Sequence, residues 1–181
     1  MQPARHIRNL ALIGFMATGK SSVGRAAARA LDFQFVDTDA LIESRLDRKI
    51  SEVFSQVGEA WFREFERRLV LEMKGWDRVV IATGGGLGAQ MANLTALREH
   101  ALVVCLWASP EIIWSRARRH MHRPLLQTPD PQGRIRQLLA ERAPVYRQAD
   151  VLVNTERRPL RRVVQQVLYH FHLARSQRPP A

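Results

Sequence analysis

The strongest constraint on the fold of this chain is a glycine-containing stretch at residues 14–24, GFMATGKSSVG. An apolar run of strand length, residues 9–15, leads into it, and residues 20–31 are rich in helix formers. A strand, a glycine loop and a helix in this order are the context in which the pattern G-x-x-x-x-G-K-[ST] binds phosphate, because backbone N–H groups turn towards the ligand. A flexible glycine turn before a capped helix is the alternative, but it requires neither the lysine nor the hydroxyl. We therefore predict a nucleotide-phosphate site here.

Two side chains of this loop carry the expected phosphate and metal chemistry. Lys20 is expected to reach the β- and γ-phosphate oxygens, and the Ser21 hydroxyl is expected to bind Mg²⁺. The full set of expected nucleotide-binding residues in the loop is Gly14, Ala17, Thr18, Gly19, Lys20, Ser21 and Ser22.

Apolar runs of strand length alternate with helix-forming runs along the chain. The expected strands are residues 9–15, 33–39, 78–82, 101–107 and 151–153. The expected helices are residues 20–31, 40–46, 50–58, 59–76, 134–146 and 159–174, with a further helix opened by Ser109, Pro110 and Glu111. This alternation predicts an α/β fold of three layers, αβα, with a five-stranded parallel sheet and ligands beyond the carboxyl ends of the strands.

The length and composition fit one globular domain. A chain of 181 residues buries roughly two-thirds of its unfolded surface. Its 46% hydrophobic and 25% charged residues are ordinary for a folded protein. We expect a single domain over residues 1–181, with a core from about 9 to 173 and a flexible C-terminal tail at 174–181. Residues 118–131 carry proline and charge without periodicity, so we expect a mobile lid there.

Charge and cysteine content bear on partners and compartment. The net charge of +11 is spread over several expected helices without a nucleic-acid motif, which favours small polyanions over nucleic acid. Cys105 is the single cysteine and lies in an apolar run, so we expect a buried structural thiol and a reducing compartment. No apolar segment of the sequence approaches the length needed to span a bilayer. We therefore expect a cytoplasmic protein with no membrane or nucleic-acid partner.

Two carboxylates end the second expected strand. Asp37 and Asp39 are two residues apart, and in extended geometry side chains at this spacing point the same way, here towards the crevice beside the phosphate loop. One can hold the water shell of a metal, while the other accepts a proton or hydrogen bond from a hydroxyl substrate. The alternative is a turn in which Asp39 caps the next helix.

Three successive glycines, Gly84, Gly85 and Gly86, follow the third expected strand. They cost backbone entropy, which indicates a place where something must approach the backbone closely. A small ligand passing close to the chain is the functional interpretation, and a sharp turn into a helix is the alternative.

Four arginines, Arg116, Arg118, Arg119 and Arg123, gather around the expected lid. Guanidinium groups suit phosphates and carboxylates, although a solvated positive face would explain most of this cluster. Arg123 is the strongest candidate for a ligand contact.

Seven ordered motifs resemble those of the shikimate kinase family, a branch of the nucleoside-monophosphate-kinase-like P-loop proteins. They are GFMATGKSSVGR, FVDTDALIE, ISEVFSQVGEAWFREFE, IATGGGL, RPLL, RAPVY and VNTERR, and the resemblance runs from about Asn9 to Leu173. It implies a kinase that uses ATP and Mg²⁺ to phosphorylate the 3-hydroxyl of shikimate, a step towards chorismate and the aromatic amino acids. We expect a monomer whose partner is this small molecule.

The resemblance also implies roles on the ATP side. Lys20 and Arg123, the lid arginine, would act on the phosphates, and Ser21 and Asp37 would lie at the metal, Asp37 through water. Two further arginines match positions around the adenine, Arg116 and, across a one-residue gap, Arg158.

On the acceptor side, the resemblance makes Asp39 the residue that binds the shikimate hydroxyls and the candidate base. Arg63 and Arg142 match the positions that grip the shikimate carboxylate, and the triple glycine matches the backbone that lines the ring. Glu66 lies one helical turn after Arg63, and an i, i+3 pair of opposite charge on one helix face is suited to orienting the guanidinium.

The chain departs from the family pattern at a few places. Ala17 stands where the phosphate loop usually has a further glycine, and Leu87 replaces the small residue that more often follows the triple glycine. These changes leave the reaction type intact and bear on substrate range. Three other functions stay open at this point: a gluconate kinase, a binding module without activity, and a nucleic-acid-binding protein.

Overall fold

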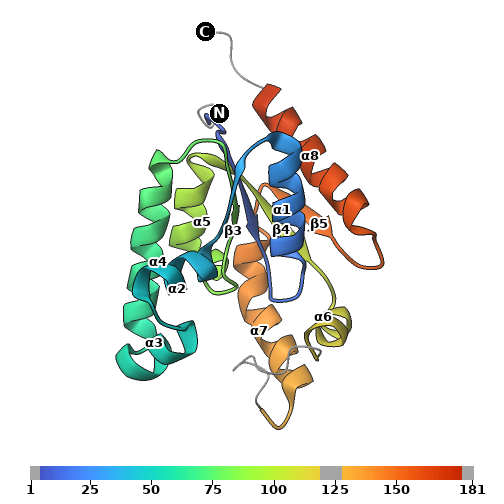
Figure 1. The fold of residues 1–181 in the computed structure, drawn as a ribbon. Helices are drawn as coiled ribbons and strands as arrows, with labels where there is room; N and C mark the ends of the chain where they lie inside the picture. The colour runs from blue at the N-terminus through green and yellow to red at the C-terminus, as the bar shows by residue number, and fades with distance from the viewer. Residues whose placement is uncertain (1–4, 119–127, 177–181) are drawn as a thin grey trace.

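The computed structural model describes residues 5–118 and 128–176. Within these residues, five parallel strands form one sheet in the order β2-β3-β1-β4-β5 (Figure 1). The strands are β1 (Asn9–Ile13), β2 (Gln34–Asp37), β3 (Val79–Ala82), β4 (Ala101–Trp107) and β5 (Val151–Asn154). The predicted α/β fold with a five-stranded parallel sheet is confirmed.

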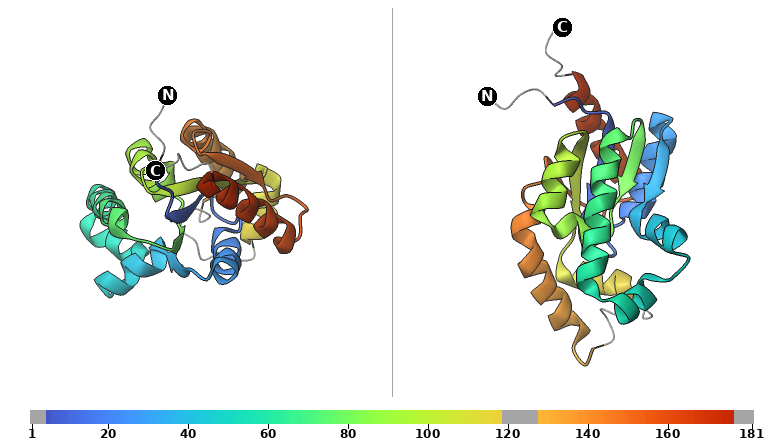
Figure 2. Two further views of the ribbon diagram at one scale, coloured as in Figure 1. Left: turned by 90° about the horizontal axis from the view of Figure 1, so that it is seen from above. Right: turned by 90° about the vertical axis from the view of Figure 1, so that its left-hand side faces the viewer.

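Helices cover both faces of the sheet (Figures 1 and 2). The α-helices are α1 (Lys20–Leu31), α2 (Thr38–Leu46), α3 (Ile50–Val57), α4 (Glu59–Glu72), α5 (Met91–Arg98), α6 (Pro110–Ala117), α7 (Pro131–Tyr146) and α8 (Leu160–Ser176), with short 3-10 turns η1 (Met73–Gly75) and η2 (Leu87–Ala89). One face packs against α1 and α8, and the other packs against α4, α5, α6 and α7. No helix in the described residues is long and apolar enough to cross a membrane.

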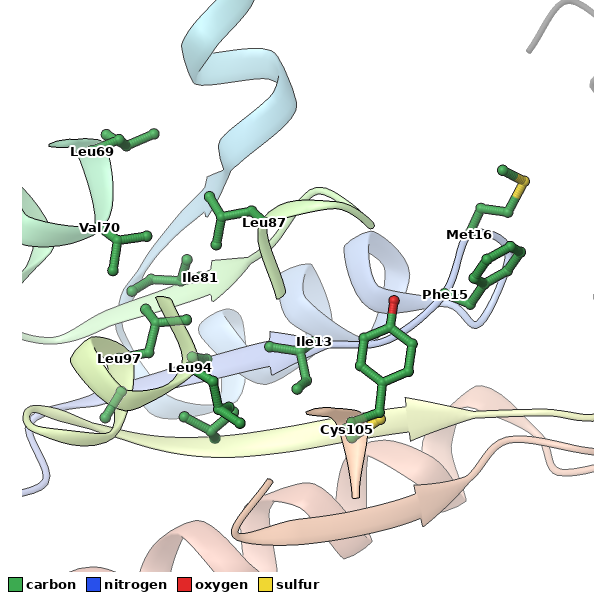
Figure 3. Close-up of a cluster of buried hydrophobic side chains, with 14 of the residues drawn as sticks. Ile13, Phe15, Met16, Leu69, Val70, Ile81, Leu87, Leu94, Leu97 and Cys105 are labelled. Carbon is green, nitrogen blue, oxygen red and sulfur yellow. The ribbon is translucent and has the colours of Figure 1, made fainter. Parts of the chain in front are cut away.

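The core consists of two clusters, one on each face of the sheet. All five residues of β1 are buried, and they alternate between the clusters: Leu10 and Leu12 lie on the α1 and α8 side, Ala11 and Ile13 on the other. Strands buried on both faces need continuous apolar runs, which is why β1 and β4 read as such in the sequence. Figure 3 shows the cluster that contains Ile13, on the side of α4, α5, α6 and α7. Cys105 belongs to it, and burial raises the pKa of its thiol to about 12, so the predicted buried thiol is confirmed.

The parallel strands end at one edge of the sheet, which faces away from the end of α8. Figure 1 shows the end of α8 at one end of the molecule and α3, α6 and the start of α7 at the other. The phosphate loop follows β1, and the triple glycine follows β3. Residues far apart in the sequence therefore meet at the carboxyl edge, as the alternation of elements predicts.

The end of β2 corrects the predicted geometry of the two aspartates. β2 ends at Asp37, whose side chain accepts a hydrogen bond from the Asp39 N–H (3.2 Å) and so caps α2. Asp39 consequently lies in the first helical turn, not in an extended strand. The expected extended geometry was wrong because an aspartate at this position satisfies an N–H group that the helix leaves without a partner.

Two helix boundaries differ from the predictions by three or more residues, and one helix was not predicted. The expected helix over 59–76 stops at Glu72 and continues as the turn η1, and α5 was not predicted. Helix α7 begins at Pro131, before the expected start at Arg134. The reason is local, because proline suits the first helical position and the side chain of Asp130 accepts from the Gly133 N–H (2.9 Å). Residues 119–127 of the expected lid lie outside the described residues.

Candidate active site

The phosphate loop has the backbone that its glycines predict. Gly14 adopts φ +132°, and a Cβ there would overlap the Leu106 carbonyl oxygen of β4. Gly19 adopts φ +97° and is the N-cap of α1, so the first N–H groups of this helix face the loop. Lys20 Nζ donates to the carbonyl oxygens of Gly14 and Phe15, both at 2.9 Å. The ammonium group thus lies over the concave backbone where phosphate would bind.

Ala17 is the loop residue whose effect the sequence left open. Its φ is +59°, in the left-handed region that glycine adopts without cost. The methyl group makes this conformation unfavourable by roughly 1–2 kcal/mol. The Ala17 carbonyl accepts from Arg116 Nη1 (3.3 Å), so α6 contributes to holding the strained turn.

A hydroxyl and a carboxylate meet beside the loop. Ser21 Oγ donates to Asp37 Oδ2 at 2.7 Å, which joins the start of α1 to the end of β2. Both are hard oxygen donors, and Mg²⁺ in kinase sites is held by one or two such protein groups together with phosphate oxygens and water. The two residues predicted for the metal are therefore adjacent and chemically suited to it.

Each residue of the triple glycine lies against a different polar side chain. A Cβ on Gly84 would overlap Asp39 Oδ1, and one on Gly86 would overlap Arg63 Nη1. A Cβ on Gly85 would lie 3.5 Å from Arg142 Nη1. Three charged groups from α2, α4 and α7 thus lie against one short backbone segment, and the missing side chains of Gly84 and Gly86 make room for two of them.

Arg63 is held by two carboxylates of its own helix. Nη1 donates to Glu66 Oε2 (2.8 Å), and Nη2 donates to Glu59 Oε1 (2.7 Å). Burial acts to lower the pKa of Arg63, but the hydrogen bonds and charges of both glutamates outweigh it and raise that pKa. The predicted pairing with Glu66 is confirmed. Burial also raises the pKa of Glu66, against the opposing effect of Arg63.

Arg142 reaches the site from α7. Its Nη1 donates to the Gly85 carbonyl at 3.1 Å, and its guanidinium carbon lies 5.3 Å from the centre of the Phe15 ring. A cavity of about 410 Å³ lies between the two arginines. Its lining residues are Glu59, Arg63, Gly86, Ala89, Gln90, Met91, Ala92 and Arg142. The volume is within the range of sites for small metabolites, and the two guanidinium groups favour an anion.

Two residues near the triple glycine were missed as parts of the site. The buried Thr38 hydroxyl accepts from the Gly84 N–H (2.7 Å), and Tyr146 Oη donates to the Gly85 carbonyl (3.1 Å). Burial raises the pKa of Tyr146 to about 12, so it stays a neutral donor. The sequence could have indicated both residues, since Thr38 separates the two aspartates and Tyr146 ends the motif RAPVY.

The two arginines expected around the adenine, Arg116 and Arg158, have different hydrogen-bond partners. Arg116 Nη2 donates to the Thr155 carbonyl (2.7 Å), which links α6 to the segment after β5 and to the phosphate loop. Arg158 donates to Gln166 of α8 (2.9 Å) and makes no hydrogen bond to Arg116 or the loop within the described residues. Arg119 and Arg123 lie outside the part of the chain that the structure describes.

Comparison with known proteins gives consistent matches over most of the chain. A family model described as shikimate kinase matches residues 16–171. A shikimate kinase from Thermodesulfovibrio yellowstonii is 43% identical over 150 residues, which cover 83% of this chain and 87% of that protein.

Solved structures also match this chain. A shikimate kinase from Acinetobacter baumannii in complex with shikimate superposes with a TM-score of 0.87 at 34% identity, covering 95% of this chain and 96% of that chain. A gluconokinase from Sinorhizobium meliloti matches with a TM-score of 0.58 at 22% identity, covering 95% of this chain and 96% of that one. The second likeness concerns the fold alone.

Proposed function

This chain belongs to the shikimate kinase family, and we propose that the carboxyl edge of its sheet positions the two substrates of the family's reaction. The enzyme is an ATP-dependent small-molecule kinase. It transfers the γ-phosphoryl group of ATP to the 3-hydroxyl of shikimate and yields shikimate 3-phosphate and ADP, in the biosynthesis of chorismate and the aromatic amino acids. One observation carries the proposal for the site: Asp39, Arg142 and Arg63 each lie against one residue of the triple glycine.

On the donor side, the phosphate loop and Lys20 bind the β- and γ-phosphates of ATP. The N–H groups at the start of α1 and the Lys20 ammonium neutralise charge on the phosphate oxygens. Ser21 Oγ would hold Mg²⁺ directly and Asp37 through water, and the bound ion supplies further neutralisation of the phosphate charge. The contact between Ser21 and Asp37 (2.7 Å) supports this assignment.

On the acceptor side, Arg63 and Arg142 bind the shikimate carboxylate, and the triple glycine lines the ring. Asp39 accepts a hydrogen bond from the 3-hydroxyl and takes its proton as the new O–P bond forms and the bond between the γ-phosphorus and the bridging oxygen of ADP breaks. The buried Glu66 keeps Arg63 in place through its hydrogen bond of 2.8 Å. Catalysis then depends mainly on positioning the 3-hydroxyl of shikimate next to the γ-phosphoryl group of ATP.

The lid at about 118–131 supplies Arg123, which contacts the transferring phosphoryl group when the lid closes and excludes water. Arg116 and Arg158 border the adenine. The hydrogen bonds of Arg116 to Thr155 and to the Ala17 carbonyl support a place next to the nucleotide.

The remaining properties follow from the sequence and stay proposals. The protein is a cytoplasmic monomer of one domain with a core at about 9–173, and it has no nucleic-acid partner. The flexible tail expected at 174–181 was wrong for residues 174–176, because α8 continues to Ser176.

One assay tests the function directly. ADP formation is measured with shikimate, with gluconate and without acceptor under the same conditions. We expect ADP formation that depends on shikimate. Dependence on gluconate would favour the related sugar-acid kinase, and ADP formation that no acceptor increases would contradict both.

A further inference from the structure

The two carboxylates that hold Arg63 differ in exposure and in the edge of the guanidinium that they occupy. The Glu66 side chain is 2% exposed and binds only Nη1. The Glu59 side chain is 65% exposed, and its Oε1 accepts from both Nε (3.2 Å) and Nη2 (2.7 Å). The Nε and Nη2 edge is one that a guanidinium presents to a carboxylate in a two-bond pair. Glu59 therefore occupies the contact that an incoming carboxylate would make.

Arg142 lines the same cavity without such a carboxylate. Its Nη1 donates to the Gly85 carbonyl, and its guanidinium lies over the Phe15 ring. The charge of Arg142 also acts on the buried Glu66. An entering anion thus meets Arg142, which donates to a backbone carbonyl, and Arg63, which Glu59 already contacts.

We propose that Glu59 competes with the acceptor's carboxylate for Arg63 and so lowers the affinity of the site for carboxylates. This inference rests on the proposed role of Arg63 in the acceptor site. A small anion that has only a carboxylate gains little when it displaces Glu59, because one ion pair replaces another. Shikimate makes additional contacts with Asp39 and the triple glycine, and these offset the lost ion pair. Glu59 therefore weakens the binding of every carboxylate, but only ligands that also carry hydroxyls bind well despite it.

The exposure of Glu59 lets its side chain exchange Arg63 for water, since 65% of that side chain is exposed. Glu59 is also the first residue of α4 and follows Gly58, whose φ is +87°. An acidic residue in a first helical turn also stabilises the helix dipole. A purely structural role for Glu59 is therefore the competing explanation, and the experiment must separate the two.

The test is the Glu59→Gln variant in the full-length enzyme, with shikimate and ATP varied separately. An exposed ion pair contributes about 0.2–1 kcal/mol, so we expect the KM for shikimate to fall by a factor of about 1.4 to 5. The kcat and the KM for ATP should not change. Cyclohexanecarboxylate, which has the carboxylate without the hydroxyls, should inhibit the variant at a lower concentration than the wild type.

Two further variants separate competition from helix stability. Glu59→Asp keeps the charge at the helix terminus but is one methylene too short for the same contact, so it should behave as Glu59→Gln does. Glu111→Gln is a matched control, because Glu111 lies in the first turn of α6, pairs with Arg136 (3.5 Å) and has a side chain that is 64% exposed. It should leave the KM for shikimate unchanged.

The outcomes distinguish this inference from the proposed function. An active wild type with an unchanged or raised KM in Glu59→Gln would overturn the inference alone, as would an equal fall in Glu111→Gln. A Glu59→Asp variant with the wild-type KM would likewise assign Glu59 to helix stability. A wild type that neither phosphorylates shikimate nor binds it in calorimetry would defeat the proposed function and the inference together.

Discussion

Arg63 lies directly against the backbone of Gly86, so closely that a Cβ at residue 86 would overlap its Nη1. The same Nη1 donates to Glu66 Oε2 at 2.8 Å. A displacement of Nη1 would therefore strain or break a partly buried ion pair. This relationship connects the third residue of the triple glycine to acceptor binding.

The first prediction concerns Gly86→Ala. The added methyl group should displace Arg63 and raise the KM for shikimate at least about tenfold, which corresponds to about 1.4 kcal/mol, with little effect on the KM for ATP. Gly75→Ala is the control, because a Cβ there has no heavy atom within 4 Å. Steady-state kinetics with each substrate varied would check this, and an equal change in both KM values would contradict it.

Arg142→Ala should also weaken acceptor binding selectively. Its loss removes a charged contact in the cavity, so the KM for shikimate should rise at least about tenfold while the KM for ATP stays within about twofold. Arg147→Ala is the matched control, since Arg147 follows α7 and is exposed. Unchanged shikimate kinetics in Arg142→Ala would remove Arg142 from the acceptor site.

Asp39→Asn should separate chemistry from nucleotide binding. The amide retains the shape of the side chain but cannot accept the hydroxyl proton, so kcat should fall by about 10²–10⁴. ATP affinity, measured by calorimetry, should stay near the wild-type value. Full kcat in the variant would show that Asp39 is not the base.

Ala17→Gly should stabilise the protein. Ala17 adopts a left-handed backbone conformation (φ +59°), and the substitution removes the free-energy cost of an alanine in this conformation. Glycine also raises the entropy of the unfolded chain, which offsets part of the gain. We expect the free energy of unfolding to rise by about 0.5–1 kcal/mol in urea denaturation. Ala26→Gly within α1 should lower it by a similar amount, because glycine is unfavourable inside a helix. A loss of stability in Ala17→Gly would contradict the strained geometry.

The lowered pKa of the buried His100 should make the stability of the protein depend on pH. Burial, with a contribution from Arg8, lowers its pKa from 6.5 to about 4, and no described residue hydrogen-bonds its Nε2. The unfolded chain therefore binds a proton that the folded chain does not, and the contribution to stability is lost as pH falls from about 6.5 to 4. The upper limit of this loss is about 3.4 kcal/mol.

The check is the free energy of unfolding of the wild type and of His100→Gln at pH 7 and pH 4.5. The difference between the two pH values should be smaller in the variant, even where the variant is less stable at both. Equal differences would assign the acid sensitivity to other groups.

Local patterns in the sequence were enough to predict the elements whose causes are local. The apolar run before Gly14, the loop glycines and Lys20 predict a strand, a phosphate loop and a helix, because each depends on residues within one turn or strand. The pairing of Arg63 with Glu66 was predictable for the same reason, since their spacing places them on one helix face.

Tertiary structure alone decided which distant groups meet. Asp39 and Gly84 lie 45 residues apart in the sequence, yet a Cβ on Gly84 would overlap the carboxylate, because β2 and β3 are neighbours in the sheet order. The sequence predicted a parallel sheet without this order. It likewise predicted the wrong geometry for Asp39, since the choice between an extended strand and a capped helix depended on where the Asp37 side chain found its donor.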